Sequence, residues 1–460
     1  MHYDALIIGA GLSGLSAGLR LALYGKKVRV FERHSIPGGL NSYYEKNGGL
    51  IDVGLHAITN YAPENLRSAT LNKILRQLRI RRDELDLRRQ LHSEIVFPQC
   101  TLRLCNEFEA FRAEIKRAFP GELASFDRMV AALPQFDSIT EADDALSARA
   151  ALENAFKEPL LREMLLCPVM FYGNPSPRDM SYAQFAIMFR SVIMEGMCRP
   201  LLGMKSIIGL LVSHFIGLGG ELSLGNGIAS LHCGAGRIQS VTDSTGAIHT
   251  ANAVISDAGA LETAALCDDA NVMPRNPRPG EMAFLEAILN LDCTPASLGI
   301  GQTVIFRSAE DKFFFDIPED DFDCRSQIFC MPGNFEGCAA IESGASLRVT
   351  LPASAKRWAA KSSGDYRASK LRAKEEICRL AEQTFPQLKG HISAYELFTP
   401  NTVRRFTGHI NGAVYGSPDK IRSGKTLLEN LFLCGTDQGL LGIVGALTSG
   451  IIIANNYALK

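Results

Sequence analysis

Residues 5–39 read ALIIGAGLSGLSAGLRLALYGKKVRVFERHSIPGG. An apolar run, Ala5–Ile8, leads into the turn Gly9-x-Gly11-x-x-Gly14, and a helical pattern follows. A second apolar run, Val28–Phe31, ends at Glu32, which lies 18 residues past the last glycine of the turn. Strand, glycine turn, helix, strand and acid follow one another in the order of a dinucleotide-binding unit.

Each residue of the turn has a predicted task. Gly9 allows the tight bend, Gly11 lets the backbone approach a pyrophosphate, and Gly14 lets helix and strand pack closely. The phosphates then meet the amides at the start of the helix, and Glu32 accepts hydrogen bonds from the ribose hydroxyls. Gly18 and Gly25 also fall at close-packing spacings. The stretch therefore predicts a nucleotide site rather than a glycine-rich turn without a ligand.

Length and composition describe a globular protein of two or three domain-sized units. The chain has 460 residues, of which 46% are hydrophobic and 21% are charged, and its net charge is −1. This balance gives no electrostatic footprint for nucleic acid, so no such partner is predicted. The densest basic stretch, Lys73–Arg89, also carries three acids. It is either a solvated face or a docking patch for an anionic membrane or an acyl carrier.

Several classes of protein are not predicted. The first residues lack the charged region and cleavage site of a signal peptide, and no uninterrupted run of about 18 apolar residues is present. The 12 cysteines form no CxxC pair, which favours small buried side chains in a reducing cytoplasm. The nine histidines show no metal spacing, so no metal is expected. We expect a cytoplasmic protein. The sequence leaves open both a peripheral contact with the inner membrane face and the oligomeric state.

Two further blocks favour FAD over a nicotinamide nucleotide. Pro37-Gly38-Gly39, followed by Leu40 and Asn41, lets the backbone lie against the far part of an extended cofactor. Near the C-terminus, Gly435-Thr436-Asp437 and then Gly442-Ile443-Val444 predict a strand that feeds a second helix start. That helix start would face the flavin ring and stabilise negative charge there, while Asp437 accepts bonds from ribityl hydroxyls. The alternative is a buried helix whose glycines serve packing.

The order of elements predicts an α/β fold with a discontinuous Rossmann-like FAD-binding domain and an inserted α+β substrate-binding domain. Helical patterns dominate from Leu71 to Gly217, with a strand pair near Ile95–Leu104, and strands follow from residue 221 onward. The sheet that begins at residue 5 is completed only near the C-terminus. The predicted boundaries are 1–70, 205–280 and 395–460 for the FAD-binding domain, and 71–204 and 281–394 for the substrate-binding domain.

Three blocks give the chain a resemblance to the FAD-dependent phytoene desaturase family, within the flavin amine-oxidase-like superfamily. They are residues 9–39, residues 219–228 (GGELSLGNGI) and residues 429–450 (ENLFLCGTDQGLLGIVGALTSG). The D-x-G-x-H pattern at Asp52–His56 and the segment Thr399–Gly416 make it more similar to carotenoid isomerases and retinol saturases. Leu40 is a departure, because many relatives have an arginine at this position.

The resemblance implies which residues hold the cofactor. Backbone groups of Ile228, the last residue of the middle block, would bind the adenine. The full set of predicted cofactor-binding residues is Gly9, Ala10, Gly11, Leu12, Ser13, Gly14, Glu32, Arg33, Gly38, Gly39, Leu40, Asn41, Ile228, Asp257, Gly435, Asp437, Gly442, Ile443 and Val444.

The segment Met164–Met204 is rich in methionine and aromatic side chains. Methionine adapts to long, irregular apolar ligands, so this segment is either an ordinary helical core or the wall of a tunnel for a polyene or acyl chain. The resemblance favours the tunnel. The predicted substrate-binding residues are Met170, Phe171, Tyr172, Phe185 and Phe189.

Four polar residues are candidates for assisting catalysis: His56, Tyr172, Glu195 and Arg199. His56 follows the second loop of the predicted cofactor domain, so it either faces the flavin or has a structural role. Glu195 and Arg199 are four residues apart in a helical pattern and are able to pair with each other.

We therefore predict an FAD-dependent oxidoreductase for a long apolar substrate, either a carotenoid or isoprenoid polyene or a long acyl chain. It would desaturate, saturate or isomerise carbon–carbon double bonds by hydride transfer at flavin N5. One alternative is a flavin amine oxidase, but no paired aromatic residues flank Gly412–Asp437. Another is a non-catalytic prenyl-binding carrier of the GDP-dissociation-inhibitor type, against which the intact glycine turn, Glu32 and Asp437 argue.

Overall fold

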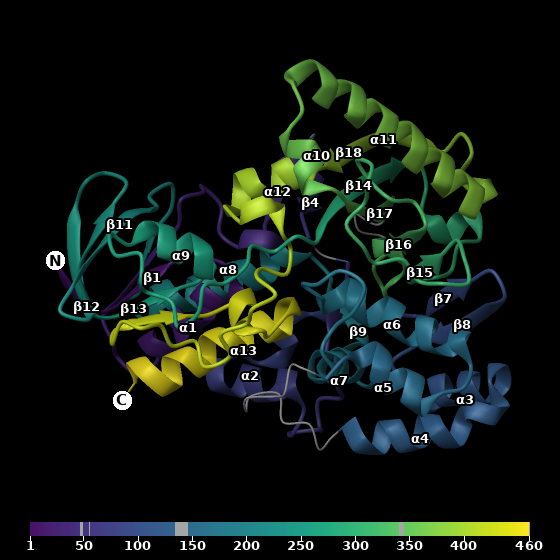
Figure 1. Ribbon diagram of the computed structural model, residues 1–460, viewed down its shortest axis with the longest axis horizontal. Helices are drawn as coiled ribbons and strands as arrows, with labels where there is room; N and C mark the ends of the chain where they lie inside the picture. The colour runs from purple at the N-terminus through teal and green to yellow at the C-terminus, as the bar shows by residue number, and fades with distance from the viewer. Residues whose placement is uncertain (47–48, 55, 134–145, 340–344, 460) are drawn as a thin grey trace.

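The computed structural model describes residues 1–46, 49–54, 56–133, 146–339 and 345–459 (Figure 1). Two seven-stranded sheets organise these residues, and both are flanked by helices. The chain ends lie on the side of the first sheet (Figure 1). The predicted mixed α/β fold is confirmed.

The first sheet is built around β1 (His2–Ile8) in the order β10-β2-β1-β13-β12-β11, with β19 beside β13. Parallel pairing joins β1 to β2 (Val28–Phe31) and to β13 (Ile248–Ser256). Near the C-terminus, β19 (Leu431–Leu433) extends the parallel part of the sheet. The sheet that opens the chain is therefore completed near its end, as predicted. The other strands are β10 (Glu221–Ser223), β11 (Ile228–Gly234) and β12 (Arg237–Asp243).

Four helices share an apolar core with this sheet. They are α1 (Leu12–Ala22), α2 (Thr70–Leu78), α8 (Met204–Gly217) and α13 (Gly442–Ile453). Gly18 of α1 permits the close approach, because a Cβ there would lie 3.2 Å from both Phe215 and Val30. Gly25 differs from the prediction: no described atom lies within 4 Å, and its φ of +71° serves the turn after α1. Among the described residues, no helix has the length and apolar character needed to cross a bilayer.

The second sheet has the order β18-β14-β17-β16-β15-β7-β8. It is largely antiparallel, and its central strands are almost entirely buried because helices cover both faces. Its strands are β7 (Ser93–Phe97), β8 (Cys100–Leu104), β14 (Ala283–Leu291), β15 (Val304–Ser308), β16 (Ser326–Cys330), β17 (Ser346–Ala353) and β18 (Ile392–Phe398).

Two groups of helices pack against this second sheet (Figure 1). One face is covered by α3 (Phe108–Ala118), α4 (Leu123–Ala132), α5 (Ala148–Ala155), α6 (Pro159–Gly173) and α7 (Tyr182–Phe189). The other carries α10 (Ala355–Ala359) and the long α11 (Ser363–Thr384). Two further helices, α9 (Ala260–Leu266) and α12 (Pro400–Thr407), follow strands of the two sheets.

The region from Leu71 to Gly217, in which helical patterns were predicted to dominate, contains two short strands that were not expected. A buried strand, β9 (Met197–Pro200), pairs with β5 (Ile58–Thr59) and with β6 (Leu87–Arg89). Gly196 precedes it with a φ of +83°, which ends the helical segment. A hairpin of β3 (Tyr43–Lys46) and β4 (Gly49–Asp52) leads toward this small sheet. The segment that carries His56 is therefore held between the two large sheets.

Candidate cofactor and active site

A cavity of about 610 Å³ begins at the carboxyl ends of β1 and β2, at Ile8 and Glu32, and reaches β14 and β17 of the second sheet, at Glu286 and Thr350. The carboxyl ends of parallel strands are the usual ligand position in open α/β sheets. The cavity joins the glycine turn to the predicted substrate region.

The glycine turn exposes bare backbone to the cavity. Gly9 adopts a φ of +95°, and its N–H donates to the Phe31 carbonyl at 2.8 Å. Gly11 has an ordinary φ of −67°, so its requirement is space, because a Cβ there would clash with the Asp257 carboxyl. A Cβ on Gly14 would clash with the Gly9 carbonyl. The turn thus brings the first amides of α1 to the wall of the cavity, where an anion is stabilised.

Glu32 is buried at the wall of the cavity. Its Oε2 accepts from the Ala10 N–H at 2.8 Å, and its Oε1 accepts from the His34 N–H at 2.8 Å. Each carboxylate oxygen keeps acceptor capacity beyond these bonds. The side chain therefore fixes the glycine turn and is still able to receive hydroxyl groups, as predicted for a ribose contact.

Asp257 lies over the same helix start, with its Oδ2 accepting from the Gly14 N–H at 3.1 Å. The pKa of this carboxyl is raised to about 7, mainly by burial and also by the charge of Glu32. The hydrogen bonds from Gly14 and Ser13 lower the pKa but do not offset these effects. The protonated acid is the form compatible with a phosphate at this position, because a carboxylate there would repel it.

The outer part of the cavity is formed where β11 begins. Gly227 and Ile228 line it together with Arg33 and Glu262. A Cβ on Gly227 would lie 2.7 Å from the Cβ of Arg33, so a side chain at that position would displace Arg33. The Arg33 guanidinium donates to the Arg405 carbonyl at 3.2 Å. The wall at Ile228 thus lies where the resemblance implies an adenine contact.

At the far end, a polar network meets the cavity. His56 Nε2 lies 3.1 and 3.2 Å from the two carboxylate oxygens of Glu286 and 3.0 Å from Thr350 Oγ1. Arg348 Nε donates to Glu286 at 2.7 Å, and Thr350 donates to the same carboxylate. Burial alone would raise the pKa of Glu286, but the charges of His56 and Arg348 outweigh it and lower the pKa to about 2. Glu286 is therefore an ionised carboxylate that pairs with the imidazole of His56 and the guanidinium of Arg348.

Tyr172 lines the same end of the cavity, and its hydroxyl is buried without a hydrogen-bond partner among the described residues. Burial raises the pKa of Tyr172 well above its usual value, and the nearby Cys330, Tyr415 and Glu286 raise it further. The hydroxyl is therefore a neutral donor, and such a group is costly to bury unless a ligand completes it. Aromatic and apolar neighbours line this chamber: Ala57, Phe171, Phe284, Ile328, Val414 and Tyr415.

The start of α13 closes the chamber on the side of the first sheet. Gly442 and Ile443 line the cavity, and Gly442 has a φ of +74°. The residue before the helix, Leu441, has an apolar side chain that cannot accept from the first amides. The positive end of this 12-residue helix is therefore free to stabilise negative charge in the chamber.

Asp437 lies in the turn that follows β19. Its Oδ2 accepts from the Ala260 N–H at 2.6 Å, and its Oδ1 accepts from the Ser417 N–H at 2.8 Å. It is not among the described residues that line the cavity. The buried carboxylate ties the turn after β19 to α9 and to the loop at Ser417. The ribityl contact of Asp437 stays a prediction.

The expected pair between Glu195 and Arg199 is wrong. Glu195 accepts from Asn60 Nδ2 at 2.8 Å, whereas Arg199 forms a buried ion pair with Asp52. Gly196 turns the chain between them into β9, so the helical spacing does not hold. Neither side chain lines the described part of the cavity.

Only some of the predicted substrate and cofactor residues reach the described wall of the cavity. Phe171 and Tyr172 do, whereas Met170, Phe185 and Phe189 pack in the core between α4, α6 and α7. Those of the predicted cofactor residues that line it are Gly9, Gly11, Leu12, Ser13, Glu32, Arg33, Gly38, Gly39, Leu40, Asn41, Ile228, Asp257, Gly442 and Ile443. Four other predicted residues do not line the described part of the cavity: Ala10, Gly14, Gly435 and Val444. Their roles stay predictions.

The sequence analysis missed Glu286 and Arg348. Both interrupt apolar strands, in FLEAILNL and SLRVTLPA. A charged residue inside a run that is otherwise buried on both faces is costly unless it is paired. That conflict was the available signal, although no spacing rule connects either residue to His56.

Comparisons with known proteins agree with this arrangement. A family model described as an NAD(P)-binding Rossmann-like domain matches residues 7–74. The chloroplastic prolycopene isomerase of Daucus carota is 23% identical over 99% of this chain and 80% of its own length. The all-trans-retinol 13,14-reductase of Danio rerio is 23% identical over 97% of this chain and 84% of its own length.

A shorter match joins the chain to a neurosporene-forming phytoene desaturase of Cereibacter sphaeroides, 30% identical over 27% of this chain and 24% of the relative. The chain is a homologue of these enzymes. This confirms the resemblance to the phytoene desaturase family and the prediction of an oxidoreductase.

Solved structures show the same fold. An oxidoreductase from Methanosarcina mazei has a TM-score of 0.67 at 16% identity and covers 99% of this chain and 100% of its own. A putrescine oxidase bound to putrescine has a TM-score of 0.61 at 15% identity, with complete coverage of both chains.

Proposed function

We propose that this phytoene desaturase homologue binds FAD and acts on the carbon–carbon double bonds of a polyene. The single observation that carries the proposal is the continuous cavity. It starts at the glycine turn and the N-terminus of α1 and passes the carboxyl groups of Glu32 and Asp257. It ends in an aromatic chamber beside the N-terminus of α13. These features fit the phosphates, the ribose and the charged ring of an extended dinucleotide.

When bound, FAD would supply a site that accepts or donates a hydride next to the substrate. The residues of the chain supply position, dryness and charge. Phe171, Phe284 and Tyr415 present aromatic surface to an extended apolar ligand. The Tyr172 hydroxyl, which has no partner within the described parts of the chain, is a donor for a polar atom of a ligand at the chamber wall.

His56 and Glu286 are the proposed acid–base pair. Glu286 is ionised and fixed by Arg348. His56 Nε2 faces this carboxylate and the Thr350 hydroxyl, so this ring nitrogen is the one placed for proton transfer. A polyene carbon that gains positive charge during isomerisation or saturation would lie beside this network. Such a site holds a proton at one ring nitrogen at the wall of the chamber, as general acid–base assistance requires.

The relatives support a polyene rather than an amine. Their names describe a prolycopene isomerase, a retinol reductase and a phytoene desaturase. In the described part of the chamber, Glu286 is already paired with His56 and Arg348, which leaves it poorly suited to receive an ammonium group.

The test uses the purified full-length protein supplied with FAD and, separately, with chemically reduced FAD. It is incubated with a poly-cis carotene, all-trans-retinol and phytoene, and the products are separated by chromatography. We expect conversion of at least one polyene. If no polyene reacts while putrescine or cyclohexylamine is oxidised, the amine oxidase alternative holds. If the protein retains prenyl lipid but no flavin, it is a carrier.

A further inference from the structure

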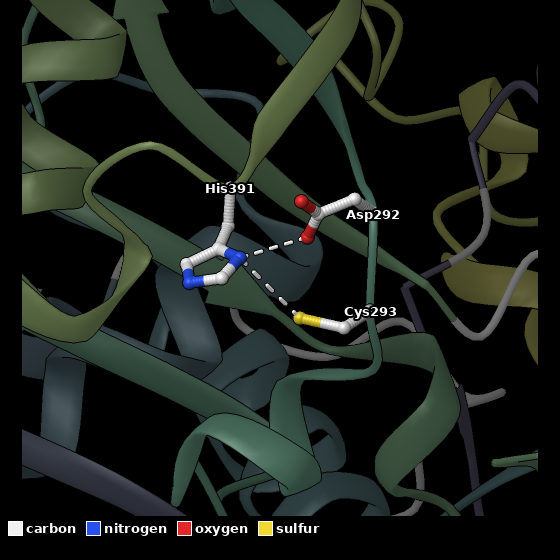
Figure 2. Close-up of side chains that lie close together, drawn as sticks. All are labelled: Asp292, Cys293 and His391. Atoms are coloured by element: carbon white, nitrogen blue, oxygen red, sulfur yellow. Dashed lines mark hydrogen bonds and ion pairs between the residues drawn. The ribbon is translucent and has the colours of Figure 1, made fainter.

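The end of β14 and the start of β18 bring together three side chains that stand apart from the cavity: Asp292, Cys293 and His391 (Figure 2). The pairing of β14 with β18 shifts register after Asn290, which redirects the chain at this point. The Asp292 N–H donates to the His391 carbonyl at 3.1 Å. The backbone therefore holds both segments in place, although they are 98 residues apart in sequence.

The three side chains converge on one atom. His391 Nδ1 lies 2.8 Å from Asp292 Oδ1 and 3.7 Å from Cys293 Sγ (Figure 2). All three atoms lie within 4.8 Å of one another. This excludes a nucleophile of the Cys-His-Asp type, because such a triad uses one ring nitrogen for the thiol and the other for the acid. Here, both groups compete for Nδ1.

We propose that these three residues bind a divalent transition-metal ion of the zinc type. Thiolate, imidazole and carboxylate are its usual ligands, whereas magnesium and calcium prefer oxygen alone. At ordinary zinc bond lengths, a tetrahedral ion holds its nitrogen and sulfur ligands about 3.6 Å apart. The observed 3.7 Å already matches this spacing.

The carboxylate of Asp292 has to move away from His391 by about 0.6 Å to admit the ion. It is free to do so, because the Asp292 side chain is 55% exposed. The His391 side chain is 38% exposed, so solvent supplies water for a fourth position. The ion would join the residues that directly follow β14 to the residue that directly precedes β18, and it would neutralise the negative charge of its ligands.

Sequence spacing predicted no metal because adjacent residues 292 and 293 find their third ligand only through the sheet. The cysteines were also expected to be buried, yet seven of the 12, including Cys293, are partly exposed. This partial exposure gives the ion access to the thiol.

The experiment treats the full-length holoprotein with a chelator, removes the chelator, and measures zinc binding by calorimetry and by elemental analysis after gel filtration. We expect one zinc ion per chain. Cys293→Ser and His391→Ala should each weaken binding at least about tenfold, a loss of 1.4 kcal/mol. Cys378→Ser, which alters a partly exposed thiol on α11, should bind as the unaltered protein does.

Absence of stoichiometric zinc overturns the proposal. So does zinc that survives both Cys293→Ser and His391→Ala, because the ion would then bind elsewhere. Flavin content is measured in the same samples and should not differ between Cys293→Ser and the control, since none of the three residues lines the cavity. Loss of zinc binding and loss of flavin binding are therefore distinguished in the same samples.

Discussion

Asp257 is an acid at a position where a bound phosphate requires the absence of negative charge. Its pKa is raised to about 7, mainly by burial, from the value near 4 of a free aspartate. The neutral form therefore dominates below pH 7, and an anion placed beside it raises the pKa further. Cofactor binding above pH 7 must take up a proton at this site.

We predict that FAD affinity falls as the pH rises from 7 to 9, by at most about tenfold per pH unit. Asp257→Asn should bind FAD more tightly at pH 8 and lose most of this dependence. The amide keeps an acceptor for the Gly14 N–H. Fluorescence titration of the apoprotein with FAD at each pH measures the affinity of the unaltered protein and of Asp257→Asn.

Glu32 and Cys434 also interact electrostatically with Asp257, and both residues are unchanged in Asp257→Asn. His56 and His409 line the cavity in both proteins as well. The difference between the two pH profiles therefore reports Asp257 alone. Parallel profiles would show that Asp257 stays ionised when the cofactor binds.

Glu286→Gln removes the charge that balances His56 and Arg348. We predict that turnover of the polyene falls by about 100-fold or more, as is typical when acid–base assistance is lost. FAD content should be retained, because Glu286 stands at the substrate end of the cavity. Product formation and released FAD are measured on the same sample.

The control is Glu396→Gln, which alters a carboxylate on the neighbouring strand that pairs with Lys46. It should keep full turnover. Equal activity of both variants would remove the His56–Glu286 pair from the mechanism.

At this scale, the sequence predicted the glycine turn and Glu32 because their tasks depend on local spacing. It did not predict the partner of His56. Glu286 lies 230 residues away, and only the pairing of β14 with β17 places it beside Thr350. The partners of Asp437 were not predicted for a related reason, since its two backbone donors come from distant segments.

Among the elements, α1 depends most strictly on one position. A methyl group at Gly14 would meet the carbonyl of Gly9, which is backbone and cannot rotate away. We predict that Gly14→Ala lowers stability by at least ~2 kcal/mol through overpacking and abolishes FAD binding. Chemical denaturation and bound flavin are the measurements.

Gly209→Ala is the matched control within α8. No described atom lies within 4 Å of a Cβ at this position, so the helix should gain up to ~1 kcal/mol. A stable Gly14→Ala variant with normal flavin content would contradict the close contact between turn and helix.

The buried Asp52–Arg199 pair joins β4 to β9. Asp52 Oδ1 also accepts from the Met204 N–H at 2.8 Å, and its carbonyl accepts from Arg348 at 3.0 Å. We predict that Arg199→Met destabilises the protein by about 3–5 kcal/mol, because it leaves a buried carboxylate without its counter-ion. Denaturant unfolding measures the loss.

Arg81→Ala removes an exposed arginine from its pair with Asp83 and should leave stability unchanged within error. If Arg199→Met proved no worse than this control, the pair would not hold β9 in place.

A short strand was predicted correctly where the glycine-turn motif placed it. The apolar run Val28–Phe31 was predicted as a strand and forms β2, whereas the four-residue β9 was expected to be helical. A short strand that is buried on both faces has no alternation to reveal it, so only its partners β5 and β6 define it.

For the whole molecule, the sequence predicted that the first sheet is completed near the C-terminus, and β19 beside β13 confirms this. The exact domain boundaries stay a prediction. The cavity between the sheets was beyond sequence reasoning, because β14, β17 and α13 reach its wall from segments far apart in the chain.

The central claim is that this cavity holds FAD. The most direct measurement is the absorption spectrum of the purified full-length protein, followed by identification of the nucleotide that heat releases. We predict a yellow protein that releases about one FAD per chain. A colourless protein that does not take up added FAD, or one that releases a nicotinamide nucleotide instead, would contradict it.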